Sequence, residues 1–203
     1  VGHQAMEDNT TAVYNTALGY QALRNNTVGT RNVAVGNNAL DANTEGEYNV
    51  AVGRNALYAN TDADSNTAVG NAALTANTTG ANNVAVGHNA LDANTTASSN
   101  TALGSDALSA NTTGGSNVAV GRNALLSNTT ANYNIAMGAD ALYTNTTGTR
   151  NVAIGEDALE ANDTGNDNTA VGSYALTLNT ASNNTAVGSY SLDANPPPLP
   201  PRV

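Results

Sequence analysis

The feature that most constrains this chain is a unit of 17 residues that is repeated almost without interruption. Successive copies begin with asparagine, at Asn15, Asn32, Asn49, Asn66, Asn83, Asn100, Asn117, Asn134, Asn151 and Asn168. A further copy begins at Asn184 after only 16 residues, which leaves one residue missing between Thr180 and Asn184. A fixed period this short is typical of a solenoid, in which each repeat forms one coil stacked on the next.

The unit is N-[VT]-A-[VLIM]-G-x-x-A-L-x-x-N-T-T-G-x-x, and its positions are numbered here from 1 to 17. Position 3 is always alanine, position 5 always glycine and position 12 always asparagine, whereas positions 6, 7, 10, 16 and 17 accept residues of every kind. We therefore expect the restricted positions to point inward or to constrain the backbone, and the variable positions to face solvent.

Each copy predicts the same local structure. Positions 1 to 4 form a short strand with positions 2 and 4 on one face and alanine 3 on the other. Glycine 5 supplies a turn with positive φ. Positions 8 to 12 favour a short strand or extended corner, with one helical turn as the alternative, and N-T-T-G closes the coil. We expect positions 4 and 9 to form the core, for example Val52, Leu57, Val86, Leu91, Val120 and Leu125.

These features predict an all-β fold, a parallel β-solenoid (β-roll or β-helix) of about 12 coils. It occupies residues 1–195, and a proline-rich tail follows at 196–203. The residue missing before Asn184 should fall in the corner at 180–183, because strand register cannot absorb it. The tail favours polyproline II and is interpreted as a linker or end plug, with a PxxP ligand as the alternative.

The invariant asparagines predict ladders along the axis. Side chains stacked in successive coils can hydrogen-bond to one another and satisfy backbone groups at the corners. The position-12 ladder comprises Asn26, Asn43, Asn60, Asn77, Asn94, Asn111, Asn128, Asn145, Asn162 and Asn179. Glycosylation is the alternative, because five of these asparagines begin N-T-T sequons: Asn77, Asn94, Asn111, Asn128 and Asn145. Asparagine persists at Asn43, Asn60 and Asn179, where the sequon is lost, which favours the structural interpretation.

Composition argues against several biochemical roles. The chain has no Cys, and 16 acidic residues against six basic ones give a net charge of −10. We therefore expect no nucleic-acid binding and no thiolate metal site. No apolar run is long enough for direct membrane insertion. His3 and His88 lie five coils apart, and no catalytic constellation or calcium-loop spacing is present, so we expect no enzyme, cofactor or metal site.

The strings NVAVG and NVAIG resemble the repeats in the head of trimeric autotransporter adhesins. The longer unit NTAVGxxALxxNTTG is similar to repeats of tail-fibre-like proteins from phages and bacteria. This resemblance implies a left-handed parallel β-roll, three chains packed side by side, and binding of extracellular-matrix or host-surface molecules. The 17-residue unit is longer than the adhesin repeat, and its second half has its own sequence.

Together these observations favour a non-enzymatic structural protein, a stiff extracellular or cell-surface rod for adhesion or for filament or matrix assembly. The alternative is a ligand-binding adhesin head that recognises a host or glycan receptor. Ice binding is less favoured, because Val28, Glu45 and Asp62 interrupt the threonine array at position 14.

The chain begins inside a repeat, and its solenoid has no recognisable cap. We therefore expect a homo-oligomer, either a side-by-side trimer or an end-to-end fibre. The alternative is a fragment of a longer solenoid. The invariant alanine at position 3 must pack closely, either against the opposite wall of its own coil or against a neighbouring chain.

Overall fold

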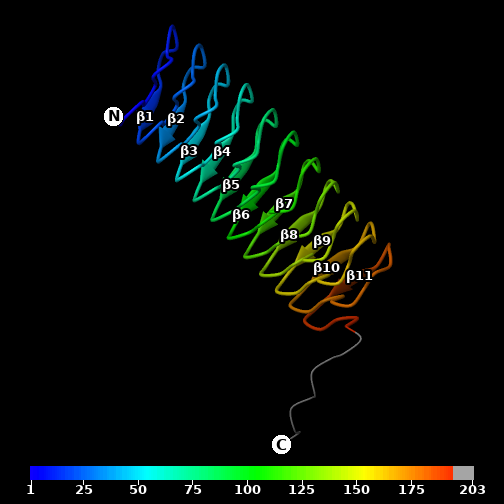
Figure 1. Ribbon diagram of the computed structural model, residues 1–203. Coiled ribbons are helices and arrows are strands. Elements are labelled where there is room, and N and C mark those ends of the chain that lie inside the picture. The colour runs from blue at the N-terminus through cyan, green and yellow to red at the C-terminus, as the bar shows by residue number, and fades with distance from the viewer. Residues whose placement is uncertain (194–203) are drawn as a thin grey trace, which may run out of the picture.

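The computed structural model describes residues 1–193, and the predicted proline-rich tail at 196–203 lies outside them. The described chain is an all-β solenoid whose coils stack along one axis (Figure 1). Its eleven strands have three residues each and form one parallel sheet in chain order. The strands are β1 (Thr16–Leu18), β2 (Val33–Val35), β3 (Val50–Val52), β4 (Thr67–Val69), β5 (Val84–Val86), β6 (Thr101–Leu103), β7 (Val118–Val120), β8 (Ile135–Met137), β9 (Val152–Ile154), β10 (Thr169–Val171) and β11 (Thr185–Val187). The predicted fold class is confirmed, and the left-handed winding stays a prediction.

Every strand pairs with its neighbour at identical repeat positions. The same register holds across the 16-residue copy, where Thr169 pairs with Thr185 and Ala170 with Ala186. The missing residue corresponds to position 14, because the carbonyl of Ala181 accepts the side-chain hydrogen bonds that position 15 accepts in other coils. The prediction that the corner absorbs the deletion and the strand keeps its register is confirmed.

The core is narrower than the sequence suggested. Alanine at positions 3 and 8 and leucine at position 9 are buried in coil after coil, as Ala85, Ala90 and Leu91 show with no exposed surface. The prediction that position 9 belongs to the core is confirmed. The same prediction for position 4 was wrong, because Val86 is 37% exposed. The middle residue of each three-residue strand points inward and its two neighbours point outward, so the coil interior holds only alanine beneath the sheet. The invariance of position 3 therefore reflects the chain's own interior.

Positions 6 to 11 form consecutive turns, so the strand or extended corner predicted for positions 8 to 12 was wrong, and in the described coils no helical turn replaces it. Asn89 and Leu91 both have left-handed backbone conformations, with φ of 51° and 56°. This conformation costs a non-glycine residue about 1–2 kcal/mol. Hydrogen bonds between coils offset that cost: Leu91 N donates to Ala107 O at 3.0 Å, and Asn89 N to Asn71 O at 3.0 Å. Backbone pairing thus continues along the axis outside the sheet.

Candidate functional site

The position-12 asparagines form a buried hydrogen-bonded column. From Asn43 to Asn162, each Nδ2 donates to the Oδ1 of the asparagine one coil earlier, at 2.7 to 3.2 Å. The same Nδ2 also donates to the carbonyl at position 15 of its own coil, as Asn94 does to Ala97 O at 3.0 Å. From Asn43 to Asn145, both amide hydrogens and the amide oxygen are therefore used, which no other side chain of this size reproduces.

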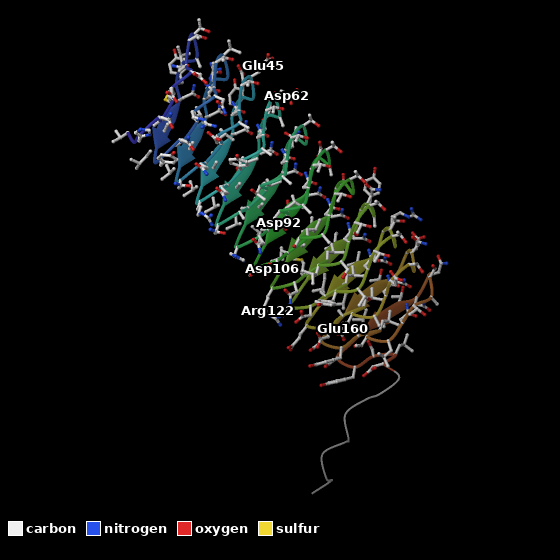
Figure 2. The ribbon with its side chains drawn as sticks, viewed as in Figure 1. Glu45, Asp62, Asp92, Asp106, Arg122 and Glu160 are labelled. Carbon is white, nitrogen blue, oxygen red and sulfur yellow. The ribbon has the colours of Figure 1, made fainter. Side chains whose placement is uncertain are left out.

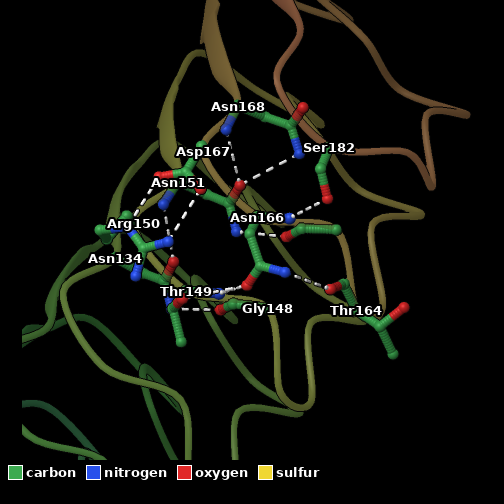
Figure 3. Close-up of polar contacts among 11 residues, drawn as sticks. Asn134, Gly148, Thr149, Arg150, Asn151, Thr164, Asn166, Asp167, Asn168 and Ser182 are labelled. Carbon is green, nitrogen blue, oxygen red and sulfur yellow. Dashed lines mark hydrogen bonds and ion pairs between the residues drawn. The ribbon is translucent and has the colours of Figure 1, made fainter.

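The position-1 asparagines form a second column beside the first. Oδ1 of Asn83 accepts the backbone N–H of Asn100 at 2.9 Å, and its Nδ2 donates to Ala97 O at 2.9 Å. Figure 3 shows the same pattern at Asn134 and Asn151, whose Oδ1 atoms accept the N–H groups of Asn151 and Asn168. One position-15 carbonyl thus joins the two columns within each coil, so the asparagines satisfy backbone groups that the sheet does not reach.

The position-12 column ends at the shortened corner. Asn179 donates its Nδ2 to Ala181 O at 2.9 Å, two residues away. Oδ1 of Asn162 is buried without a hydrogen-bond partner. The structure therefore brings together nine of the ten predicted ladder residues, from Asn26 to Asn162, and separates Asn179 from them.

The five N-T-T sequons have inaccessible acceptor nitrogens. Asn77, Asn94, Asn111, Asn128 and Asn145 have no exposed surface, and each Nδ2 makes two hydrogen bonds inside the coil. A glycan attached there would have to displace the coil wall. The interior geometry is therefore incompatible with glycosylation of these residues in the folded chain.

Replacing Asn94 by aspartate should lower the stability of the rod by about 3 kcal/mol or more at neutral pH. The new carboxylate would face two acceptors, Asn77 Oδ1 and Ala97 O, to which Asn94 now donates. Burial would raise the pKa of this carboxyl group, so the loss should shrink as the pH falls and the group becomes protonated. Thermal melting at neutral and acidic pH measures the effect. Asn71→Asp, at an exposed position-6 site, is the matched control and should melt like the parent; equal melting of both variants would contradict the buried ladder.

The outward side of the sheet is uncharged and mostly apolar. Positions 2 and 4 of strands β1 to β11 carry only Val, Thr, Ile, Leu and Met, and no charged residue. Several of these side chains are more than a third exposed, among them Leu103 at 37%, Ile135 at 37% and Met137 at 41%. We call these two columns the apolar face. Sequence reasoning missed it by assigning position 4 to the core, although position 4 shares its face with position 2, which accepts threonine in several copies.

The charged side chains lie away from the apolar face and in part inside the wall. Figure 2 shows Glu45 and Asp62 at loop tips on one side of the rod, and Asp92 and Asp106 along the other. Position 10, expected in solvent, is buried at Asp41, which is only 3% exposed. Burial raises the pKa of the Asp41 carboxyl, and the Arg24 guanidinium at 3.0 Å opposes that shift.

The acids at positions 7 and 10 also influence one another. Burial raises the pKa of Glu160, and the nearby Asp157 and Asp140 raise it further. In the described residues, no group of three or more His, Cys, Asp or Glu side chains is arranged to hold a metal ion. The two histidines lie five coils apart. His3 stacks on Tyr20 with ring centroids 5.5 Å apart, and His88 Nδ1 lies 4.0 Å from a carboxylate oxygen of Asp106.

The exposed threonines at position 14 occupy six consecutive coils. The exposed position-14 column comprises Thr79, Thr96, Thr113, Thr130, Thr147 and Thr164. Beside it, the position-13 hydroxyls are used inside the wall, as Thr95 Oγ1 donates to Thr112 O at 3.2 Å. Residues 1–193 contain no helix long and apolar enough to cross a membrane.

Comparison with known proteins adds no relative. The chain matches no protein-family model, and no similar curated protein or solved structure was found. The structure shows a parallel β-solenoid of stacked coils, and no family or homologue ties it to the adhesin heads.

Proposed function

We propose that this chain is a non-enzymatic structural rod that associates side by side with further copies of itself. The observation that carries the proposal is the apolar face, two uncharged columns that run along all eleven strands and are left half-exposed by the single chain. Contiguous exposed apolar surface of this extent is typical of an interaction site in a soluble protein.

The apolar face reaches the minimum size expected of a biological interface. Eleven strands at about 4.8 Å spacing, each about 10 Å long, present a strip of roughly 500 Å². Two such strips would bury on the order of 1,000 Å² in total, which is about the threshold for a biological interface. A chain with a net charge of −10 would resist association through charged surfaces, so an uncharged strip is the favourable place for contact.

The periodicity makes the apolar face complementary to itself. Copies that lie parallel present the same coil spacing, so the side chains of one sheet can pack coil by coil against those of the next. Three copies around one axis is the arrangement that the resemblance to adhesin heads implies. The same resemblance supports an extracellular or cell-surface location, with adhesion to matrix, glycan or host-surface molecules or filament assembly as the role.

Light scattering coupled to size exclusion, with negative-stain imaging, tests the association. We expect the parent to have the mass of several chains and the double variant Val86→Glu, Val120→Glu to be a folded monomer. The matched control is Thr79→Glu, Thr113→Glu, at position 14, where Glu45 occurs naturally, and it should assemble like the parent. A parent that stays monomeric at every concentration, or a face variant that assembles normally, would refute the proposal.

A further inference from the structure

The shortened corner at 179–183 faces the corner at 162–165 of the preceding coil. From Asn26 to Asn162, successive corners are joined by hydrogen bonds at positions 12 and 13. Within residues 1–193, both of these bonds are missing between the corner at 162–165 and the shortened one. We call this boundary the seam.

The side-chain amide of Asn179 is turned away from the seam. One coil earlier, Asn162 Nδ2 donates to Asn145 Oδ1 at 3.2 Å, but Asn162 Oδ1 is itself buried and receives no hydrogen bond. Asn179 instead donates to Ala181 O at 2.9 Å and accepts from Asn184 Nδ2 at 3.2 Å. These bonds join groups at most five residues apart in the chain, so they do not tie the corner to the preceding coil.

The backbone ladder at position 13 stops at the same boundary. Thr129 N donates to Thr146 O at 3.2 Å, and Thr146 N donates to Asp163 O at 2.9 Å. In the part of the chain that the structure describes, the N–H of Asp163 finds no acceptor, and the carbonyl of Thr180, the equivalent group one coil later, accepts no hydrogen bond. A corner that is one residue shorter therefore does not reach its neighbour at this position.

The walls on either side of the seam stay joined. Strand β10 pairs with β9 in register, and in the turns Ala161 N donates to Thr177 O at 2.8 Å. At position 16 the N–H of Asn166 donates to the Ser182 hydroxyl at 2.9 Å, an exposed bond drawn in Figure 3. Between these attachments, and within residues 1–193, the segment 179–181 makes no hydrogen bond to the preceding coil.

We infer that residues 179–181 open and close as a local unit while the sheet of the rod stays paired. Opening breaks only bonds to Asn184 and within the coil itself, chiefly Asn179 N to Leu176 O and Asn168 Nδ2 to Ala181 O. A segment with so few attachments opens at a much lower free energy than the whole chain unfolds.

The open state also relieves an unfavourable feature of the closed one. Asn162 Oδ1 is a buried acceptor without a partner, and a buried polar group that makes no hydrogen bond is destabilising. Movement of the corner admits water to this oxygen. The shortened corner is therefore a conformational device in an otherwise uniformly bonded rod, and it requires neither self-association nor any particular location.

Insertion of one threonine should close the seam. Placed between Thr180 and Ala181, it gives the corner the residues N-T-T-A-S, identical to those at 94–98, where both ladders are complete. We expect Asn179 in this variant to donate to Asn162 Oδ1, as its counterparts do in the other coils.

Deletion of Thr113 should create a second seam in the middle of the rod. Thr113 occupies position 14, the position that the natural short copy lacks. Strand register is intact across that natural copy, so the variant should fold with its strands paired. We expect Asn111 to lose its 3.1 Å bond to Asn94 and its corner to open. This variant separates the effect of a short corner from the place of Asn179 along the rod.

Amide hydrogen exchange, resolved residue by residue by NMR, measures the opening. Asn179 and Asn145 are a matched pair, because each N–H donates to the carbonyl three residues earlier, at 3.0 and 3.2 Å. We expect Asn179 to exchange at least about tenfold faster than Asn145 in the parent, and the insertion to remove most of this difference. The Gly172 amide, which donates to Ile154 O at 2.7 Å, should stay slow in both proteins.

The deletion variant completes the experiment. Exchange at Asn111 should accelerate by a similar factor, whereas Asn77, two coils away, should keep its parental rate. Equal rates at Asn179 and Asn145 in the parent, or an unchanged Asn179 rate after the insertion, would overturn the inference. So would a Gly172 amide that exchanges as fast as Asn179, because the whole coil would then be opening.

Discussion

Replacing Leu91 by aspartate should destabilise the rod by about 4 kcal/mol or more and lower its melting temperature accordingly. Leu91 has no exposed surface and belongs to the single line of leucines that fills the coils, packed among alanines such as Ala85 and Ala90. No cation or donor in that line can pair with a carboxylate. Because each coil contacts only its two neighbours, loss of one coil should divide the rod into two shorter stacks, each less stable than the whole.

Thermal and urea unfolding followed by circular dichroism measure this effect. Thr96→Asp is the matched control in the same coil, at the exposed position 14, where Asp62 occurs naturally. We expect it to change the free energy of unfolding by less than about 0.5 kcal/mol. Similar melting of Leu91→Asp and the parent would show that position 9 does not form the core.

Replacing Gly87 by alanine should destabilise the rod by roughly 3–5 kcal/mol, by combining two effects. Gly87 has φ of +143°, a conformation in which a side chain is strained. A Cβ added there would also lie 2.3 Å from the carbonyl oxygen of Gly104 in the next coil. That contact is with backbone, so it can be relieved only by moving the coils apart and weakening the hydrogen bonds between them.

Gly188 serves as a control that has the unfavourable backbone conformation of Gly87 but lacks its close contact with the next coil. Its φ is +127°, but among residues 1–193 an added Cβ would meet only the Ser191 Cβ, at 3.8 Å. Gly188→Ala should therefore show the conformational strain alone, about 1–3 kcal/mol. The difference in unfolding free energy between the two variants measures the close approach of successive coils. If Gly87→Ala were as mild as Gly188→Ala, stacking would not be the reason for glycine at position 5.

The sequence by itself determined the coil and its period. Repetition identified which positions are constrained, and three of them had one physical explanation each. Glycine at position 5 needs positive φ, leucine at position 9 is the large apolar residue that recurs in its half of the coil, and asparagine at position 12 persists where its sequon is lost. Alternation in the strand also placed positions 2 and 4 on one face and position 3 on the other.

Only the tertiary structure decided which of these faces is the inside. Val86 is larger and more apolar than Ala85, so hydrophobicity alone favours valine as the core residue. Closure of a 17-residue coil leaves space for alanine only between the sheet and Leu91, and this turns position 4 outward to form the apolar face. A local pattern contains no information about that space, because it is defined by the opposite wall.

The same reason explains the turns at positions 6 to 11 and the burial of Asp41. Local propensity disfavours a left-handed leucine, and that conformation is stabilised by the Leu91–Ala107 backbone bond, which exists only when coils are stacked. Position 10 varies freely in the sequence, yet Asp41 is buried beside Arg24 of the preceding coil. These contacts join residues one coil apart, so they depend on the spacing of coils in three dimensions and could not be derived from one repeat.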